Sequence, residues 1–447
     1  MNGNTTTTTT SSRTTRVVVL GGSYGGVACI NKLLQRLPKD SRVAITLVES
    51  RDARYHCIAS YRALVQKDFA KNLWIPYTNL FPAGSPHKIV RAKVEHILHD
   101  HVLVAPTDDA STDTSKPLQK LEFDYLVIAT GSMVPSPAKW KVTSSAKGIE
   151  LMDKTRRDVE LCKKIVVIGG GACGVEIAGE IKYAFPDKTV TLIHDMPALV
   201  DYPKFPDSFK NEARRYLEKQ GVEVILNERV EIEGLSRENS VQRADRTVRL
   251  KGSDRTIESD LQFFSIGMQV DTSIMSTLIP PESSNATSVD QKKTADSFDY
   301  KTMLDPKTKA IRVKPTLQLE NEHFPHIFAI GDVSTADPVP TCMAAVAAGE
   351  TAARNLVKLI QMDSTSHKQA GGEHAENGAD GYHCRSWNKL EDYVPIRPQM
   401  VLAMNPTGGV CHLPIVGTWF GSLAAWMVKS GDLFSGRFWS EMNMPRP

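Results

Sequence analysis

Two stretches of the chain share one pattern of hydrophobic and polar positions. In residues 16–28 and again in residues 164–178, an unbroken aliphatic run leads directly into a glycine cluster, and a pattern with helical spacing follows. An unbroken apolar run bounded by glycine predicts a strand that is buried on both faces. Each stretch is therefore predicted to be a strand, a tight turn and a helix. The unit occurs twice, about 150 residues apart, and such repetition is much harder to obtain by chance than a single copy.

Further apolar runs place the remaining elements. Short strands are expected at residues 43–48, 88–94, 101–104, 123–129, 189–194, 222–226 and 324–330. Residues 55–64 have poor periodicity and predict a loop that runs into a short helix, whereas residues 341–359 are alanine-rich and predict a helix. Residues 280–300 and 363–381 are rich in small polar residues, which predicts a surface insertion and a low-complexity patch.

Length and composition restrict the class of protein. A chain of 447 residues is long enough for two or three domains, because single cores stop growing at roughly 250 to 300 residues. The formal net charge is only +3 and no stretch concentrates Lys and Arg, so nucleic acid is not an expected partner. Seven scattered cysteines favour reduced thiols inside a cell. The N-terminus lacks the apolar core of a signal peptide, so the protein is expected not to be secreted.

The glycine clusters have the character of nucleotide-binding turns. Such turns follow the spacing Gly-x-Gly-x-x-Gly, because backbone N–H groups must approach a pyrophosphate closely and the helix N-terminus adds partial positive charge. The second cluster has the complete spacing at Gly169, Gly171 and Gly174. In the first cluster Ser23 stands where a glycine is expected, which is tolerable if its side chain points away from the pyrophosphate. The glycines of that first cluster are Gly21, Gly22, Gly25 and Gly26.

The residue that ends the strand after each cluster bears on the ligand. Glu49 follows the apolar run 43–48, at about the distance expected for a carboxylate that grips an adenosine ribose. At the corresponding place after the second cluster stand His194 and Asp195. A glutamate there would favour NADH and an arginine NADPH. His194 leaves the choice open, because a protonated imidazole would tolerate a phosphate, and Asp195 favours NADH slightly.

These motifs together resemble a known family. The two glycine clusters, Ala-Thr-Gly at residues 129–131 and Ile-Phe-Ala-Ile-Gly-Asp at residues 327–332 are similar to those of flavoprotein oxidoreductases with two dinucleotide-binding domains. Residues 428–434 and the segment around Ala63 resemble the apoptosis-inducing-factor-like subgroup. The resemblance implies an α/β fold with two Rossmann-like, glutathione-reductase-like domains. The NAD(P)H domain would be inserted in the FAD domain, and a small C-terminal α/β cap would follow.

The resemblance also implies cofactors and site residues. It implies FAD as the cofactor and NADH or NADPH as the co-substrate. The positions expected at FAD are Gly21, Gly22, Ser23, Gly25, Gly26, Glu49, Arg62, Thr130, Gly131, Gly331 and Asp332. The other expected cofactor-binding positions are Gly169, Gly171, Gly174, His194 and Gly267. Glu176 matches a family glutamate near nicotinamide and flavin and is the expected catalytic residue, and no metal is expected.

Several positions have structural alternatives. Glu176 would alternatively pair with a neighbouring cation. Arg62 would alternatively anchor a loop, and His194 would fix the end of a strand. The family often carries a lysine early in the helix after the Gly-Asp motif, yet no lysine occurs between Asp332 and Arg354. This chain therefore has no residue at the position of that lysine, and the role of the lysine is not carried over to it.

The expected domain organisation follows from these features. The predicted parts are a disordered tail (1–13), a first FAD-binding part (14–150), an NAD(P)H-binding domain (151–300), a second FAD-binding part (301–362), a low-complexity insertion (363–381) and a C-terminal cap (382–447).

The expected reaction is hydride transfer from NAD(P)H to FAD, followed by transfer of electrons to a quinone-type acceptor. Cys57 has no second cysteine within the next few residues, which excludes the dithiol relay of disulfide reductases, and no iron–sulfur or haem motif is present. One alternative acceptor is a small electron-carrier protein. An alternative of another class is a redox-responsive signalling or nucleic-acid-associated protein of the apoptosis-inducing-factor type.

The C-terminal residues 410–428 nearly reach the ~20 apolar residues that a membrane span needs. His412, Pro414 and two glycines instead favour a packed element that covers the flavin domain. The tryptophans of the segment favour peripheral contact with a membrane as a further alternative. The expected location is intracellular, either cytoplasmic or peripheral at a membrane such as a lipid droplet or mitochondrial surface.

Overall fold

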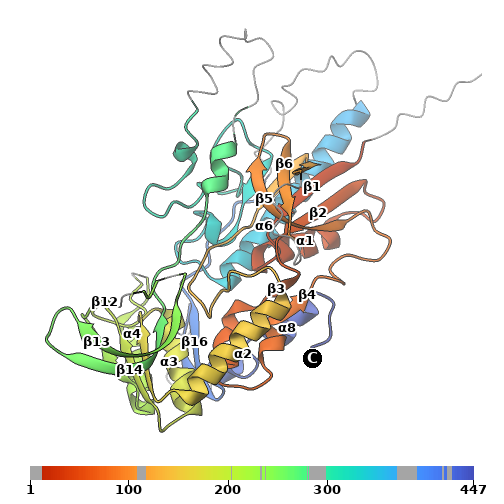
Figure 1. The fold of residues 1–447 in the computed structure, drawn as a ribbon. Helices are drawn as coiled ribbons and strands as arrows, with labels where there is room; N and C mark the ends of the chain where they lie inside the picture. The colour runs from red at the N-terminus through yellow and green to blue at the C-terminus, as the bar shows by residue number, and fades with distance from the viewer. Residues whose placement is uncertain are drawn as a thin grey trace, which may run out of the picture.

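The computed structural model of the chain has two lobes, each built around a β-sheet, with short elements between them (Figure 1). The structure describes residues 13–107, 117–202, 204–231, 234–236, 238–278, 280, 298–369, 390–414, 417–419 and 425–446. Residues 1–12 of the predicted tail, 281–297 of the predicted surface insertion and 370–381 of the low-complexity patch lie outside this part of the chain.

The first lobe contains a seven-stranded sheet in the order β15-β8-β1-β2-β5-β6-β7. Its strands are β1 (Thr15–Leu20), β2 (Val43–Glu49), β5 (Lys88–Ile97), β6 (His101–Pro106), β7 (Gln119–Glu122), β8 (Tyr125–Ile128) and β15 (Ile327–Ala329). The strands from β15 to β5 are parallel, and β6 and β7 are antiparallel. Helices α1 (Tyr24–Arg36) and α6 (Cys342–Gln369) pack together beside this sheet (Figure 1). The backbones of the two helices approach closely at Gly349. An ideal Cβ on this residue would lie 2.3 Å from the carbonyl oxygen of Gly25.

The second lobe contains a six-stranded sheet in the order β11-β10-β9-β14-β13-β12. Its strands are β9 (Lys164–Ile168), β10 (Thr189–Ile193), β11 (Glu223–Ile225), β12 (Val230–Glu231), β13 (Val241–Leu250) and β14 (Thr256–Phe264), and its helices are α3 (Ala172–Ala184) and α4 (Asp207–Gln220). Helix α2 (Ser145–Leu161) precedes β9. All strands of this sheet lie in sequence between β8 and β15 of the first sheet, so the second lobe is an insertion in the first. The predicted α/β fold class with two Rossmann-like units is confirmed.

Short elements lie between these strands and helices along the chain. They are β3 (Ala53–Tyr55), β4 (Trp74–Pro76) and the 3-10 helices η1 (Cys57–Leu64), η2 (Ala70–Leu73), η3 (Ser273–Thr277), η4 (Tyr300–Met303) and η5 (Gly331–Val333). The η1 turn, which the sequence predicts as a loop and short helix, contacts both α2 and α3. It therefore carries residues of the first lobe to helix α3 of the second.

The C-terminal cap contains β16 (Met400–Asn405), β17 (Gly408–Leu413), β18 (Gly417–Trp419), the single π-helical turn η7 (Trp426–Ser430) and α8 (Ser435–Ser440). Its sheet packs on α3 and α4 of the second lobe through β16 and β17, whereas the sequence leads us to expect residues 410–428 to cover the flavin domain. The physical reason lies in α3, where Gly179 has no side chain and an ideal Cβ would lie 2.6 Å from the carbonyl oxygen of Met404. Two other segments of the cap reach the first lobe: Arg354 of α6 donates to Glu391 at 2.7 Å, and the Asn31 side chain donates to the carbonyl of Glu441 at 2.8 Å.

One boundary differs from the prediction. Helix α6 continues to Gln369, so the low-complexity patch predicted from residue 363 begins later than expected. No glycine or proline occurs between Glu350 and Ala370, and the polar residues 363–369 therefore extend the helix. Within the described ranges, no helix is both long and apolar enough to cross a bilayer.

Candidate cofactor and active site

The first glycine cluster forms a turn between β1 and α1 in which Gly21, Gly22 and Gly26 have no room for a side chain. Gly21 has a φ of +99°, and an ideal Cβ there would lie 2.4 Å from the carbonyl oxygen of Ala129. An ideal Cβ on Gly26 would lie 1.9 Å from the carbonyl oxygen of Gly21, and one on Gly22 would lie 2.6 Å from the hydroxyl of Tyr77. The backbone of this turn is thus held close to its neighbours, as a pyrophosphate-binding turn requires.

Ser23 fits this turn without strain. It is the N-cap of α1 with a φ of −93°, a value that any residue adopts, and its carbonyl oxygen accepts from the Val27 N–H at 3.0 Å. Its side chain makes no capping hydrogen bond with α1. The departure from the glycine pattern at this position is therefore structurally neutral.

Glu49 joins the end of β2 to the glycine turn. Its Oε2 accepts from the Gly22 N–H at 2.8 Å, and its Oε1 accepts from the Arg51 N–H at 3.0 Å and the Ser50 hydroxyl at 3.2 Å. A carboxylate has about four acceptor positions, so these three bonds orient Glu49 and leave capacity for a ribose hydroxyl. The buried carboxylate and the open backbone fit the adenosine end of FAD.

The Gly331–Asp332 motif lies beside the end of β8. Asp332 Oδ2 accepts from the Ser132 hydroxyl at 2.6 Å, and Gly131, with a φ of +73°, has no described atom within 4 Å of an ideal Cβ. Thr130 is exposed at the same strand end. The pairing of β15 with β8 brings these positions together from segments about two hundred residues apart, as the sequence predicts.

A lysine that sequence analysis missed stands at this motif. Lys139 Nζ donates to the Ser132 carbonyl at 2.6 Å and lies 4.0 Å from Asp332 Oδ2. It comes from the linker after β8 and not from the helix after Gly331. Its position in the sequence does not indicate that it lies near Asp332, because only the path of the linker brings the two residues together.

The second glycine cluster repeats the geometry of the first. Gly169 has a φ of +112°, and an ideal Cβ there would lie 2.5 Å from the carbonyl oxygen of Ser265. An ideal Cβ on Gly174 would lie 1.9 Å from the carbonyl oxygen of Gly169. Gly171 is the N-cap of α3. Both turns are therefore built for the same close approach of a ligand to backbone.

The remaining predicted nucleotide positions differ in their placement. His194 packs on this second turn, since an ideal Cβ on Gly170 would lie 2.7 Å from atoms of its ring. Gly267 lies apart, in an exposed position after β14 with a φ of +78°. Two residues beyond it, Gln269 forms a backbone bridge with Met133 that ties the two lobes.

Two buried ion pairs lie on one face of α3. Glu176 Oε1 accepts from Lys429 Nζ at 2.6 Å and from the Ala403 N–H at 2.8 Å. One turn along the helix, both oxygens of Glu180 accept from Arg62 Nε, at 2.8 and 2.9 Å. Burial raises the pKa of Glu180 to about 7, although Arg62 acts to lower it. Both structural alternatives from the sequence are thus present: Glu176 pairs with a cation, and Arg62 anchors η1 to α3.

A group of polar and aromatic side chains lies between α1, η1 and the C-terminus. His56 Nε2 bonds to the carbonyl oxygen of Leu433 at 2.8 Å, so Nε2 carries the proton and Nδ1 accepts from the Tyr24 hydroxyl at 3.1 Å. Burial lowers the pKa of His56 to about 3, in agreement with this neutral form. The Tyr24 hydroxyl also lies 3.6 Å from Cys57 Sγ. No disulfide joins the six cysteines in the described part of the chain.

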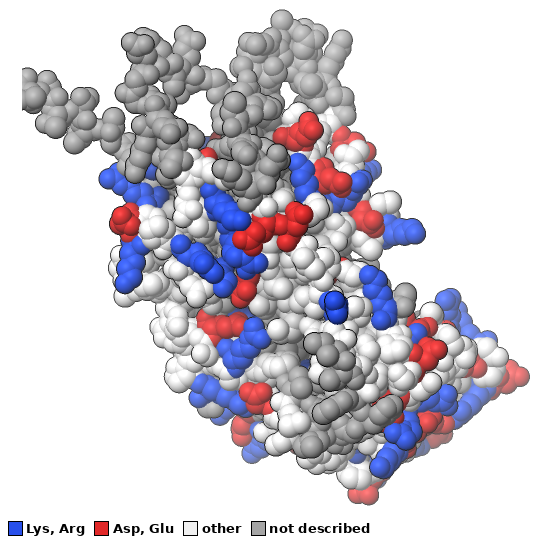
Figure 2. All heavy atoms as spheres, turned by 180° about the vertical axis from the view of Figure 1, so that it is seen from behind, with Lys and Arg blue, Asp and Glu red and all other residues white. Residues whose placement is uncertain are grey.

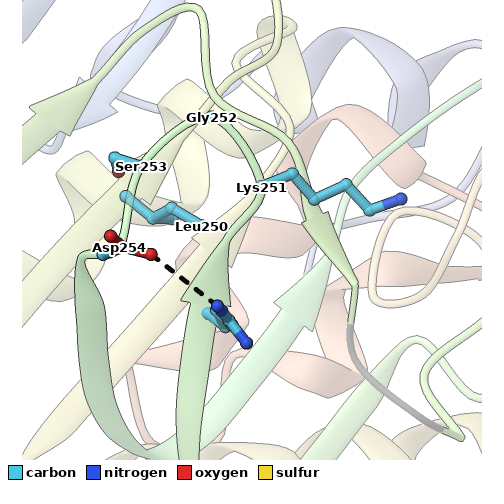
Figure 3. Close-up of a pocket in the computed structure, with 6 residues that line it drawn as sticks. Leu250, Lys251, Gly252, Ser253 and Asp254 are labelled. Carbon is cyan, nitrogen blue, oxygen red and sulfur yellow. Dashed lines mark ion pairs between the residues drawn. The ribbon is translucent and has the colours of Figure 1, made fainter.

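The other surface features have fewer groups that could bind a ligand or take part in a reaction. A hollow of about 580 Å³ lies at the β13–β14 turn and is lined by residues 249–254, with an exposed ion pair between Arg249 and Asp254 at 3.7 Å (Figure 3). It holds no buried polar group, so it is not comparable with the glycine turns. On the face shown in Figure 2, basic and acidic residues alternate and no basic stripe forms. The described residues contain no group of three or more His, Cys, Asp or Glu that could hold a metal.

Comparison with known proteins agrees with this geometry. The family described as pyridine nucleotide-disulphide oxidoreductase matches residues 15–352. Apoptosis-inducing factor homolog B of Dictyostelium discoideum is 26% identical over 438 residues, which are 96% of this chain and 97% of that protein. Ferroptosis suppressor protein 1 of Taeniopygia guttata is 29% identical and that of Homo sapiens 28%, each over 96% of both chains. The resemblance to the apoptosis-inducing-factor-like subgroup is confirmed.

Solved structures share the fold. The NDH2 of Plasmodium falciparum in complex with NADH has a TM-score of 0.60 at 12% identity, over 97% of this chain and 99% of that one. The sulfide:quinone oxidoreductase of Aquifex aeolicus has a TM-score of 0.56 at 18% identity, over 78% of each chain. At these identities the comparison establishes the architecture.

Proposed function

The chain belongs to the pyridine nucleotide-disulphide oxidoreductase family, and from this premise we propose that it oxidises NAD(P)H and passes the electrons to a quinone-type acceptor. Family membership implies FAD as cofactor and NADH or NADPH as co-substrate. When bound, FAD accepts hydride from the nicotinamide and releases the electrons to the acceptor. The observation that carries the proposal is the pair of glycine turns with equal geometry, since an ideal Cβ on Gly26 or on Gly174 would lie 1.9 Å from the carbonyl oxygen of Gly21 or Gly169.

We propose that the first lobe (14–150 and 301–362) binds FAD and that residues 151–300 bind NAD(P)H. In the first lobe, the turn at residues 21–26 would receive the pyrophosphate and Glu49 the ribose. Asp332, oriented by Ser132 and Lys139, would accept hydrogen bonds from the ribityl chain. In the second lobe, the turn at residues 169–174 would bind the second pyrophosphate.

Glu176 is the proposed catalytic carboxylate. Lys429 and the Ala403 N–H both bond to its Oε1, and its Oε2 has no hydrogen-bond partner among the described residues. That oxygen is available to accept a hydrogen bond at the nicotinamide or the acceptor.

The proposal of a quinone as acceptor rests on the arrangement of the cysteines in the chain. Cys57 pairs with no other cysteine in the described residues, so a small molecule is a better acceptor than a protein dithiol. Peripheral membrane contact stays a prediction, which is supported by Trp426 and Met427 on η7, whose side chains are exposed.

The test is anaerobic titration of the purified protein. We expect a flavin absorption band that is bleached by NADH and restored by a soluble quinone. Absence of bound flavin would refute the cofactor assignment. Bleaching by NADH without recovery on quinone addition would refute the acceptor, and recovery on addition of a ferredoxin or rubredoxin would then favour a protein carrier.

A further inference from the structure

A strap of chain crosses the second glycine turn. This name is used for residues 195–202, which lead from β10 toward α4. The Val200 N–H donates to the carbonyl oxygen of Gly170 at 2.8 Å. An ideal Cβ on Gly170 would also lie only 2.6 Å from Cδ2 of Leu199, and both Leu199 and Val200 are buried. The strap is therefore packed directly on the glycine turn.

Val200 is held in an unfavourable backbone conformation. Its φ is +46°, in the left-handed region that a β-branched residue rarely adopts. Such a conformation persists only where the surrounding structure enforces it, and it is typical of segments that clamp or release a ligand. The Tyr202 N–H then donates to the Val200 carbonyl at 2.7 Å, which closes a three-residue turn. The strap thus ends in a strained turn that places Tyr202.

The Tyr202 hydroxyl lies at the middle glycine of the Gly-x-Gly-x-x-Gly pattern. Apart from the chain neighbours of Gly171, this oxygen is the only described atom within 4 Å of an ideal Cβ on that residue, at 3.5 Å. The lack of a side chain at the middle glycine is what allows a pyrophosphate to approach the backbone. The hydroxyl therefore stands in the space that the pattern keeps free for a ligand.

The same hydroxyl bonds to the N-terminus of α3. Burial raises the pKa of Tyr202 above its usual value, and the Ala172 N–H, which donates to the phenolic oxygen, acts to lower it. The first N–H groups of a helix have no partner within the helix, and Gly171, the N-cap of α3, has no side chain to supply one. A bound pyrophosphate would accept from these N–H groups. The phenol and the pyrophosphate therefore compete for one place.

We propose that Tyr202 is a gate for NAD(P)H, whose phenol closes the second glycine turn in the free protein and swings away when the pyrophosphate binds. This inference rests on the proposed binding of NAD(P)H by the second lobe. Tyr202 is only partly buried, so its ring can rotate toward solvent. A gate of this kind lowers the apparent affinity in proportion to the fraction of molecules in which it is open.

The experiment measures binding of NAD⁺ to the flavin-loaded protein by isothermal titration calorimetry. NAD⁺ has the same pyrophosphate as NADH but cannot reduce the flavin, so binding is measured without turnover. Tyr202→Phe keeps the ring and removes the hydroxyl, and it is expected to lower the Kd about threefold, as the loss of one competing hydrogen bond implies. Tyr202→Ala also removes the ring, and we expect it to lower the Kd about tenfold.

Kinetics add a second readout. Anaerobic reduction of the flavin by NADH is expected to keep its wild-type rate constant at saturation in both variants, while the NADH concentration at half-saturation falls. A gate acts on binding and leaves the reacting groups in place, so only the second quantity changes.

Tyr183→Ala is the matched control, because Tyr183 lies near the other end of α3 and is 43% exposed. It is expected to leave the Kd unchanged. An unchanged Kd in both Tyr202 variants would overturn the gate, and so would weaker binding, since the hydroxyl would then be a donor to the dinucleotide. If Tyr202→Ala loses its flavin band, Tyr202→Phe decides alone. Failure of NAD⁺ and NADH to bind to the wild type and to every variant would instead overturn the proposed function of the second lobe.

Discussion

Replacement of Lys429 by methionine tests how the C-terminal cap is held on α3. The Lys429 side chain is 9% exposed and that of Glu176 is 6% exposed, with the ammonium 2.6 Å from the carboxylate. The substitution keeps most of the side-chain volume and removes the charge. Glu176 then retains only the Ala403 N–H as a donor and stays buried as an unpaired anion.

The expected loss follows from that unpaired charge. Breaking a buried ion pair by removing one partner costs about 3–5 kcal/mol, since the remaining charge keeps its desolvation penalty without the compensating attraction. Removing both charges costs much less. We therefore expect Lys429→Met to lose about 3–5 kcal/mol of unfolding free energy, and Lys429→Met combined with Glu176→Gln to recover most of it.

Urea denaturation followed by tryptophan fluorescence measures these differences. Lys147→Met is the matched control, because Lys147 pairs with Glu150 on α2 with both side chains more than half exposed, and its loss is expected to stay below about 1 kcal/mol. The reasoning is refuted if Lys429→Met costs no more than Lys147→Met, or if the double variant is less stable than the single one.

Two further predictions concern the first turn and Glu180. Gly26→Ala should yield protein without a flavin band, because its Cβ would stand 1.9 Å from a carbonyl oxygen, whereas Gly436→Ala, which meets only the Asp432 side chain at 3.3 Å, should keep the band. Retention of full flavin content by the Gly26 variant would contradict the close packing of the turn. The raised pKa of Glu180, about 7, favours its protonated form in the folded state, so its contribution to stability is complete below about pH 4.5 and is lost as pH rises through 7. We expect the stability difference between wild type and Glu180→Gln to change by about 3 kcal/mol between pH 5 and 8 in urea titrations, and a constant difference would disprove the shift.

The sequence predicts the two tight glycine turns because their constraints are local. Gly26 and Gly174 must lack a side chain for reasons set within one strand, turn and helix, and a spacing pattern records this directly. At Ser23 the sequence pattern demands a glycine that the backbone conformation does not require. The pattern expects glycine there, but the φ of −93° imposes no such requirement, and only the backbone conformation reveals it.

Contacts between distant segments are less accessible to sequence reasoning. Lys139 reaches Asp332 across almost two hundred residues, and Lys429 reaches Glu176 across 253. For each lysine, taken from the sequence alone, a solvated charge is the ordinary expectation. Its partner depends on how the linker and the cap fold over the lobes, and no local pattern encodes that path.

Helix α3 explains why the lobes and the cap keep one arrangement. Its N-terminal end packs closely on the turn after β9, because an ideal Cβ on Gly174 would lie 1.9 Å from the carbonyl oxygen of Gly169. From this helix, Glu180 holds Arg62 of the first lobe and Glu176 holds Lys429 of the cap. The two ion pairs therefore position the first lobe and the cap relative to the second nucleotide turn. We therefore expect loss of either ion pair to change how the lobes and the cap pack on one another before it unfolds either sheet.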